Sequence, residues 1–408
     1  FTLFKKESSE SDSLSQFQTF STALAATVGT GSVVGVGECI RIGGAGSVFR
    51  MWVSAFFGMG LAYCENYLGV RCSDGKLCGA ASYLEKIGRT KLTAVLFAVF
   101  TVGASLGMGN MVQTGSAAAA AREGVGIPSY IFALVVLIFV FLVAVGKNSA
   151  ACLCEKLVPI MAVLFLLGGI VVLCSRIKFI PETFAMIFKE AFVPKAAIGG
   201  ALGVAIKKAI SQGAKRGLFS NEAGMGSTPH AHALAHVKRP HDQGVVAMIG
   251  VFIDTFVVLT MTALVVITTL YTGDGILASE VAPAGIDKTN MAQTAFSGVF
   301  GQGLGQAFVA ICLFFFAFST ILSWNLFGRI NMNYLFGKRS NLIYSILAMG
   351  FIVLGSFLSN DLVWELTDFF NYLMVLPNVI ALIALSSYVA KESRKPGKSL
   401  KKKADQAE

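Results

Sequence analysis

The sequence predicts an all-α protein that crosses a membrane many times. Of its 408 residues, 55% are hydrophobic and only 14% are charged, which leaves too little polar surface to coat a soluble globule of this length. Apolar segments long enough to cross the roughly 30 Å hydrocarbon core as helices also recur along the whole chain. A transmembrane β-barrel would instead show alternating segments of about ten residues. We therefore expect a polytopic helical membrane protein.

Ten segments have the length and apolarity of a spanning helix. They cover residues 17–42, 44–70, 92–121, 129–146, 150–174, 198–234 with an interruption, 246–271, 299–327, 341–358 and 364–390. We therefore expect a single transmembrane domain over residues 1–390, followed by a basic tail over 391–408. The chain does not begin with Met, so we expect its N-terminus to be trimmed or incomplete.

The distribution of cations predicts the orientation of these spans, because Lys and Arg accumulate in cytoplasmic loops. One set of alternate loops is rich in them, as is the loop over residues 71–91, whereas the opposite loops carry mainly Asp and Glu. Arg176, Lys178, Lys189 and Lys195 form a basic exception on that opposite side. We predict that both ends are cytoplasmic, in the inner membrane of a prokaryote. The net charge of +10 then indicates attraction to a membrane surface rather than to nucleic acid.

The first span contains a segment that weakens a helix at mid-depth, VGTGS at residues 28–32. Irregular backbone survives in a membrane only where it is buried in protein or lines a cavity. A break here would direct N–H groups near Thr30 and Gly31 at an anion such as a carboxylate. Carbonyl groups near Ala25 to Val28 would face a cation. Close helix packing through small residues is the alternative explanation of this segment.

The sixth span is interrupted in a similar manner by SNEAGMGSTP at residues 220–229, where a continuous helix would have no Asn, Glu, Gly or Pro. Transporters built from repeats carry paired broken helices in corresponding positions. Two breaks five spans apart suggest two inverted repeats of five helices. The first repeat would cover about 17–174 and the second about 198–358, followed by a last helix over 364–390.

Other polar groups within the spans are candidates for function, because each is costly in a bilayer. In the eighth span Ser319 and Thr320 offer adjacent hydroxyls to a monovalent cation, although such hydroxyls usually bond their own helix. Gln113 and Asn110 lie three residues apart on one helix face, where they could bind a substrate or join two helices. The remaining groups are Glu222, Asp254, Glu38, Glu65 and Lys156. Of these, Glu38, Glu65 and Lys156 could instead reach an interface.

The sequence carries no motif of a known catalytic or metal site. No nucleophile elbow, Walker loop, HExxH or dinucleotide fingerprint occurs. The cluster of His230, His232, His236 and His241 has no carboxylate or Cys to complete a tetrahedral metal site. The eight cysteines form no CxxC pair. We therefore expect neither enzymatic activity nor a cofactor.

The spans contain four distinctive segments, which read ALAATVGTGSVVGV, GMGNMVQ, GAKRGLFSNEAGMGSTPHAHA and FAFSTILSWNLFG. Together these segments resemble the alanine or glycine:cation symporter family of bacteria and archaea, and GLFSNEAGMGS is highly specific to it. The resemblance implies a LeuT-type fold of ten core helices, usually preceded by an additional N-terminal helix that we expect to be missing here. It also implies Na⁺-coupled uptake of alanine or glycine.

The resemblance further implies which residues form the binding sites. Thr30 and Gly31 would hold the substrate carboxylate, and the pocket would be lined by Gln113, Phe219, Ala223, Gly224 and Trp324. The sodium site would combine the carbonyl groups of Ala25 and Val28 with the hydroxyls of Ser319 and Thr320. Two residues depart from the family pattern, Ser32 and Glu38, and both bear on the substrate range and on the coupling.

These inferences predict a secondary transporter in which Na⁺ and a small neutral amino acid bind the same broken helices. Each ligand would stabilise the arrangement that the other needs. Rocking of one helix bundle against the other would expose the site to each side of the membrane in turn. A proton-coupled carrier of the same fold is the alternative. An ion channel is a weaker one, because the spans carry no charged ring to line a pore.

Overall fold

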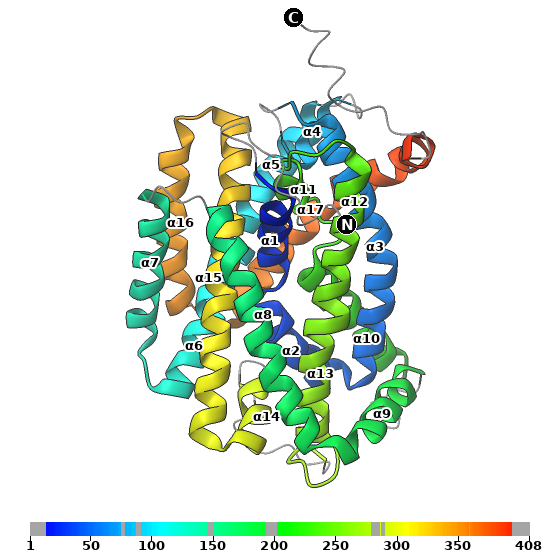
Figure 1. Ribbon diagram of the computed structural model, residues 1–408, viewed down its shortest axis with the longest axis vertical. Helices are drawn as coiled ribbons and strands as arrows, with labels where there is room; N and C mark the ends of the chain where they lie inside the picture. Colours follow the sequence, from blue (N-terminus) through cyan, green and yellow to red (C-terminus); the bar gives the residue numbers. More distant parts are fainter. Residues whose placement is uncertain are drawn as a thin grey trace, which may run out of the picture.

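The computed structural model describes residues 14–74, 78–86, 91–145, 150–192, 202–278, 286, 290–358 and 360–393, in which the regular elements are helices (Figure 1). The helices are α1 (Gln16–Thr27), η1 (Thr30–Ser32), α2 (Val34–Gly43), α3 (Gly46–Cys72), α4 (Ala80–Lys86), α5 (Lys91–Ala104), η2 (Ser105–Val112), α6 (Gln113–Val125), α7 (Ser129–Val145), α8 (Ala150–Ser175), η3 (Ile177–Phe179), α9 (Ile180–Phe192), α10 (Leu202–Asn221), α11 (Pro229–His232), α12 (Pro240–Phe252), η5 (Ile253–Leu259), α13 (Thr260–Val266), η6 (Ile267–Tyr271), α14 (Met291–Phe300), α15 (Gln302–Phe336), α16 (Ser340–Phe357) and α17 (Asn360–Ser393). The predictions for Phe1, for Lys195 and for the tail beyond Ser393 lie outside the described residues.

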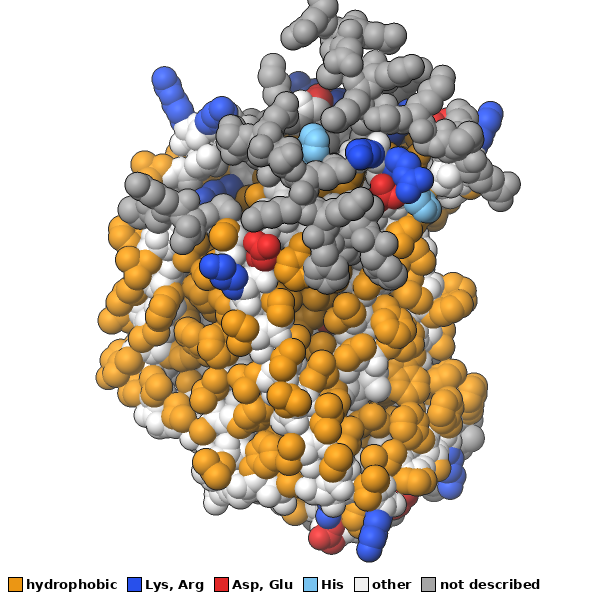
Figure 2. Space-filling model, in the orientation of Figure 1, with side chains coloured by type: hydrophobic (Ala, Val, Ile, Leu, Met, Phe, Trp, Pro, Cys, Tyr) orange, Lys and Arg blue, Asp and Glu red, His pale blue; other side chains and the backbone are white. Residues whose placement is uncertain are grey.

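The described helices confirm a multi-pass membrane protein. Six are long and apolar enough to cross a membrane, and α1 with η1 and α2 forms a seventh span that is bent by 56°. The other three predicted spans correspond to α3, to α7 and to the pair α10 and α11. Figure 2 shows a broad apolar belt around the middle of the molecule, with charged side chains gathered at the two ends. The apolar belt matches the hydrocarbon layer of a bilayer.

The structure differs from the sequence prediction in two places, the eighth span and the segment between the fifth and sixth spans. The eighth span was expected over 299–327, and this is wrong at both ends: Gly301 (φ 83°) separates α14 from α15, which then runs from Gln302 to Phe336. The helix α9 was not anticipated at all between the fifth and sixth spans. It is amphipathic, and Phe188 and Phe192 pack against Phe49 of α3, with ring centroids 5.6 and 5.4 Å apart. Short helices that lie against a bundle give no span-length signal in the sequence.

The bundle has two ends, which are named by the helices they carry. In Figure 1 the upper end carries α4 and the lower end carries α9 and α14. At the α9 end, Arg176 forms an ion pair with Asp274 over 2.6 Å, so one member of the basic exception is neutralised locally. The Arg176 guanidinium also holds the pKa of the exposed Asp274 carboxyl below its ordinary value, chiefly through this hydrogen bond. The α4 end contains the basic 71–91 loop.

The two broken helices occupy the centre of the bundle (Figure 1). α1 contacts α8 and α15, while α2 and α10 contact each other and α3. α15 is buried over most of its length, because it passes directly beside α1 and α6. The breaks are therefore shielded from lipid by the surrounding helices, which is the condition under which irregular backbone persists in a membrane.

Candidate functional site

The first break lies where the sequence predicts it. α1 stops at Val28 (φ −80°, ψ 75°), and the chain makes one turn of 3₁₀ helix over Thr30–Ser32 before α2 starts at Val34. Every residue from Val28 to Ser32 is buried. The break thus frees backbone groups from the regular i→i−4 pattern in a place where water does not satisfy them.

A glutamine side chain satisfies part of this break. The backbone N–H and the hydroxyl of Thr30 both donate to Oε1 of Gln113, each over 3.0 Å. The amide is held in this orientation because Nε2 of Gln113 donates to the carbonyl oxygen of Met108, also over 3.0 Å. Met108 lies five residues before Gln113, which is the hydrogen-bond spacing of a π-helix such as η2. A substrate carboxylate could take the place of this amide oxygen at Thr30.

Thr320 of α15 contacts the end of α1, where the sequence predicts a cation site. Its hydroxyl donates to the carbonyl oxygen of Ala25 over 2.7 Å. A Cβ built on Gly29 would lie 2.8 Å from Thr320 Oγ1 and 3.0 Å from Gln113 Oε1. The amide of Gln113 and the hydroxyl of Thr320 therefore converge on Gly29 from two elements, where a larger residue would clash with both.

The neighbouring Ser319 lies differently from Thr320. Its hydroxyl donates to the carbonyl oxygen of Phe316 over 3.1 Å and contacts Sδ of Met161 on α8 over 3.3 Å. Successive residues of a helix point about 100° apart. In this conformation Thr320 but not Ser319 reaches α1, so the sodium-site role of Ser319 stays a prediction. Val28, the fourth predicted ligand, is the residue at which α1 ends.

The second break also lies where the sequence predicts it, between Asn221 at the end of α10 and Pro229 at the start of α11. Three residues here adopt left-handed backbone conformations: Glu222 (φ 54°), Gly224 (φ 85°) and Gly226 (φ 77°). Two of them are Gly, which has no steric penalty in this region. Glu222 is the exceptional one, and such strain is typical of functional segments.

Polar side chains from two other helices hold the second break. The carboxylate of Glu65 on α3 accepts from the N–H groups of Gly224 over 3.2 Å and Gly226 over 3.0 Å. Asn378 on α17 donates to the same carboxylate over 3.0 Å and to the carbonyl oxygen of Gly224 over 2.9 Å. Glu65 is fully buried, so the alternative that it reaches an interface is wrong. Lys156, by contrast, is exposed on α8.

An aromatic stack covers the first break on its α9 side. A Cβ built on Gly31 would lie 2.7 Å from the ring of Phe219 on α10. The Phe219 ring contacts that of Trp364 on α17, with centroids 4.8 Å apart. The guanidinium of Arg216 lies over Trp364, with its carbon 4.4 Å from the ring centroid. Phe219 therefore lies directly on Gly31, as expected for a residue lining a small pocket.

Ion pairs of Arg216 lie on the same side of the break as this stack. Arg216 Nη2 lies 2.7 Å from Glu38 Oε2 on α2, and its Nη1 lies 3.4 Å from Asp368 Oδ1 on α17. Lys215 forms a second ion pair with Asp368. Only 3% of the Arg216 side chain is exposed, so the pairs are shielded from solvent. Glu38 is therefore a buried partner of α10 and does not reach an interface, contrary to the alternative considered from the sequence.

The other predicted pocket residues contact groups other than Thr30. Trp324 donates from its indole N–H to Glu222 over 3.0 Å and packs on Gly109. The Ala223 side chain contacts the position of Gly58 on α3 and belongs to a small apolar cluster there. A Cβ on Gly224 would meet Leu61, also on α3. Their roles as pocket residues stay predictions.

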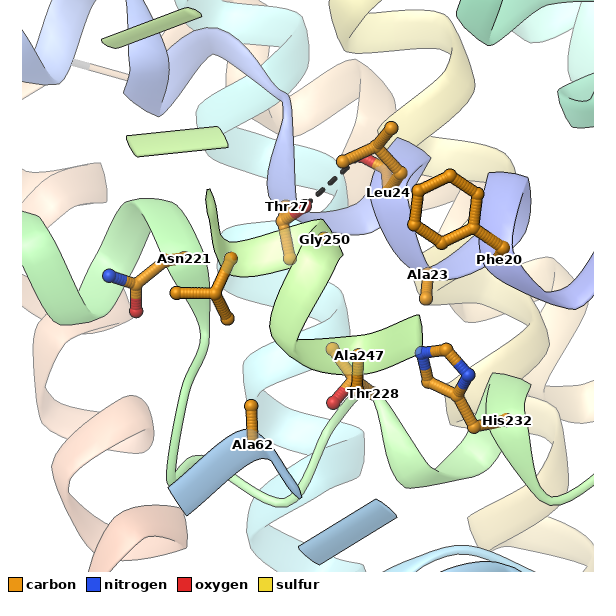
Figure 3. Close-up of a pocket in the computed structure, with 11 residues that line it drawn as sticks. Phe20, Ala23, Leu24, Thr27, Ala62, Asn221, Thr228, His232, Ala247 and Gly250 are labelled. Atoms are coloured by element: carbon orange, nitrogen blue, oxygen red, sulfur yellow. Dashed lines mark hydrogen bonds between the residues drawn. The ribbon is translucent and has the colours of Figure 1, made fainter. Parts of the chain in front are cut away.

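A small cavity, with room for about one water molecule, lies beside both breaks (Figure 3). Thr27 marks the end of α1 there, and its hydroxyl donates to the carbonyl oxygen of Leu24 over 3.1 Å. Asn221 and Thr228 border it from the second break. The cavity is lined by Phe20, Ala23, Leu24, Thr27, Ala62, Asn221, Thr228, His232, Ala247, Gly250 and Val251. Among the described residues, the site is thus sealed toward the α9 end and bordered by this small cavity.

Two helices broken at mid-bundle are the arrangement found in the LeuT-type fold. Solved structures support this fold. The chain superimposes on MhsT in complex with L-phenylalanine with a TM-score of 0.66, at 15% identity and over 92% of this chain and 90% of that one. A variant of the manganese transporter of Eremococcus coleocola gives a TM-score of 0.55 at 16% identity, over 94% and 80%.

The chain belongs to the sodium:alanine symporter family, whose family model matches residues 1–408. It is 39% identical to the sodium/alanine symporter AgcS of Methanococcus maripaludis, over 97% of this chain and 86% of the relative. It is also 37% identical to an uncharacterised transporter of Haemophilus influenzae, over 96% and 86%. A putative sodium/proton-dependent alanine carrier of Bacillus subtilis, YrbD, is 35% identical over 94% and 81%. The chain is therefore a cation-coupled amino-acid symporter.

Proposed function

We propose that the chain takes up alanine or glycine together with Na⁺, by alternating access in the cell membrane. The observation that supports this proposal is the convergence of Gln113 and Thr320 on Gly29, between the N–H of Thr30, which would bind the carboxylate, and the carbonyl of Ala25, which would bind the cation. These groups are neutral, and a zwitterion suits a site with few fixed charges. The α4 end would face the cytoplasm, with both chain ends on that side.

The substrate would bind in two parts. Its carboxylate would accept from the N–H and hydroxyl of Thr30, displacing the oxygen of Gln113, and would lie against the backbone of Gly31. The ring of Phe219, which already lies on Gly31, limits the side chain of the substrate to a small group. Trp324, Ala223 and Gly224 would approach when α10 and α11 rock against α1, so that the pocket forms from both breaks.

Sodium would bind at the end of α1. The carbonyl oxygens of Ala25 and Val28 and the hydroxyl of Thr320 supply three neutral oxygens, a set that suits a hard monovalent cation. Ser319 would add a fourth oxygen after rotating away from its own helix. Because the ion and the substrate order the same stretch of backbone, each raises the affinity for the other by the same factor. The two inverted repeats would cover about 17–174 and 198–358. Because they share one architecture, the two halves could exchange conformations and so open the site to each side of the membrane in turn.

Uptake into proteoliposomes tests this proposal. We expect uptake of L-alanine that requires an inward Na⁺ gradient, that competes with glycine, and that glutamine inhibits only weakly. Uptake that persists when choline replaces Na⁺, and that follows a pH gradient instead, would establish the proton-coupled alternative.

A pair of glycine variants tests the convergence of Gln113 and Thr320 on Gly29 directly. Gly29→Ala should abolish uptake, because the added methyl group would fall within 2.8 Å of Thr320 and 3.0 Å of Gln113. Gly350→Ala on α16 is the matched control, since a Cβ there meets nothing within 4 Å. Normal uptake by the Gly29 variant would show that the substrate and the ion bind elsewhere.

A further inference from the structure

The helix α9 has no role in the proposed site, and one of its faces is directed away from the bundle. Thr183, Ile187 and Ala191 lie on its buried face at helical spacing. The opposite face is exposed and consists of Pro181, Glu182, Ala185, Phe188, Lys189 and Phe192. On this face Phe188 and Phe192 are 47% and 72% exposed. A short helix thus presents two aromatic rings to its surroundings.

Contacts with the turn between α2 and α3 hold α9 in one orientation. The carboxylate of Glu190 accepts from the N–H of Ala45 over 2.8 Å, and Arg50 donates to the carbonyl oxygen of Ala191 over 2.7 Å. A Cβ built on Gly46 would lie 2.2 Å from the carbonyl carbon of Glu190, so the two backbones are in close contact. The exposed face of α9 is therefore a fixed surface of the molecule.

The position of α9 along α3 places it at the edge of the apolar belt. Trp52 lies about 9 Å from the start of α3, and its ring centroid is 6.5 Å from that of Phe184 and 6.2 Å from that of Phe188 on α9. One turn further toward the middle of α3, Phe56 and Phe57 are both exposed, as side chains in contact with lipid are. The apolar face of α9 therefore continues the lipid-facing surface of α3, at the level where headgroups meet acyl chains.

Two lysines border this apolar face. Lys189 lies on it beside the two exposed rings, and Lys178 lies in η3 directly before α9; both are exposed. Neither forms an ion pair within 4 Å with another residue that the structure describes, in contrast to Arg176. The acidic Glu182 lies in the first turn of α9, where a carboxylate also complements the positive end of the helix. Ammonium groups on long side chains beside an apolar face are typical of helices that bind anionic lipid.

We propose that α9 is an interfacial helix that binds an anionic phospholipid at the α9 end of the bundle. The acyl chains would lie against Phe188 and Phe192. The phosphodiester of the headgroup would accept from the ammonium group of Lys189, and Lys178 would add to the attraction. This role accounts for the basic exception in the distribution of cations, which the transport site does not use. It does not depend on which substrate or ion the protein carries.

Trp52 is a local reporter of this contact. The chain has three tryptophans, of which Trp324 and Trp364 are buried, whereas Trp52 is partly exposed and lies against α9. The purified full chain is placed in phosphatidylcholine vesicles that contain brominated phosphatidylglycerol or brominated phosphatidylcholine, and the quenching of tryptophan fluorescence is measured. We expect the parent chain to prefer phosphatidylglycerol by about fivefold, the contribution of one lysine near an anionic headgroup. The double variant Lys178→Gln, Lys189→Gln should be quenched equally by both lipids.

Control variants separate a site at α9 from a general attraction of the protein to anionic lipid. Lys156→Gln removes an exposed cation near the start of α8, whose other end leads to α9, and should keep the preference. Trp52→Phe should lose most of the quenching, as expected if the lipid lies at α9. Equal quenching of the parent chain by both lipids, or an equal loss of preference in Lys156→Gln and the double variant, would refute the site.

Two further outcomes decide the remaining cases. If neither lipid quenches the parent chain, the exposed face of α9 is covered by water or by another protein, and the proposal is overturned. If the double variant does not fold, the parent chain is measured at low and high salt, and a preference that salt does not weaken excludes the lysines as its cause. These measurements require no transport, so the proposed function can fail in the uptake assay while the lipid site stands.

Discussion

The two breaks are sealed by different chemistry. In the first break, the neutral groups of Gln113 and Thr320 satisfy the freed backbone. In the second, the carboxylate of Glu65 accepts from two backbone N–H groups and Asn378 completes the arrangement. A neutral hydrogen bond contributes about 1 kcal/mol net, whereas one to a charged group contributes roughly twice as much. The comparison indicates that the first break can exchange its partners for ligands, while the second is a permanent hinge.

The largest effect is expected at the permanent hinge. Glu65→Ala would leave the N–H groups of Gly224 and Gly226 buried without an acceptor, which costs about 1–3 kcal/mol for each group. We expect the variant to lose most of its folded yield and its thermal stability in detergent. Glu65→Gln should be intermediate, because it keeps one acceptor oxygen. Asp242→Asn, which alters a surface ion pair with Arg239, is the control, and equal melting temperatures for all of these variants would remove the distinction between the breaks.

A smaller effect on stability, but a larger one on binding, is expected at the exchangeable break. Gln113→Ala removes the acceptor that the substrate carboxylate would displace from Thr30. Binding then no longer costs that hydrogen bond, so we expect alanine binding to tighten by roughly tenfold. The comparison variant is Asn110→Ala on the same π-helix, whose amide bonds Asn325 on α15. We expect that variant to lower thermal stability with little change in alanine affinity. Isothermal titration against alanine measures the affinities, and the reverse ranking would contradict the assignment of Thr30.

The cation side of the first break gives a more selective effect. Thr320→Ala should raise the half-saturating Na⁺ concentration of uptake several-fold while leaving the discrimination between glycine and alanine nearly unchanged, because its hydroxyl contacts the carbonyl of Ala25. Ser319→Ala sharpens the test. If Ser319 becomes a ligand on binding, its variant will share the shift. If Ser319 stays bonded to Phe316, only the Thr320 variant will show it. An unaltered Na⁺ response in Thr320→Ala would show that this end of α1 does not bind the ion.

The smallest effect is expected at the ion pairs that join the two broken helices on their α9 side. Asp368→Asn leaves the pair of Arg216 with Glu38 in place, so we expect only a two- to threefold change in uptake rate, at the low end of buried-charge effects. Glu38→Gln removes the direct link between α2 and α10 and should have the larger effect of the two. The measurement is the uptake rate of both variants at several salt concentrations. If Glu38→Gln changes this rate no more than Asp368→Asn does, the link between α2 and α10 adds nothing to the contact with α17.

The sequence predicted the parts of the fold that depend on length and hydropathy. Its ten spans correspond to helices, and both breaks lie at the glycine-rich segments that were singled out. The short helices α9 and α14 were missed, because a helix that packs on the surface of a bundle needs neither the length nor the apolarity of a span. The boundary at Gly301 was also missed, although the glycines of SGVFGQGLGQ at residues 297–306 carried a helix-stop signal, because the apolar stretch continues across them.

The site was predictable only in part. The resemblance led to Thr30, Gln113 and Thr320, and the structure brings these three together. Partners from distant helices could not be deduced, because a pairing such as that of Glu65 with Gly224 joins positions 159 residues apart. Asn378 carried a weak signal, since it is an amide beside Pro377 in the apolar stretch over residues 372–385 of the last span. The identity of its partner still depends on how α17 packs against α3.

The π-helix η2 fixes the rotational register of everything that follows it in the third span. Its wider turn holds one residue more than an α-helix of the same rise would accommodate, and Gln113 is the first residue beyond it. Converting this segment to an α-helix with the same number of residues would turn the rest of the span by about 100°. Gln113 would then point away from the first broken helix, although no contacting residue had been replaced. Substitutions that favour a regular α-helix over η2 are therefore expected to disturb the site from a distance.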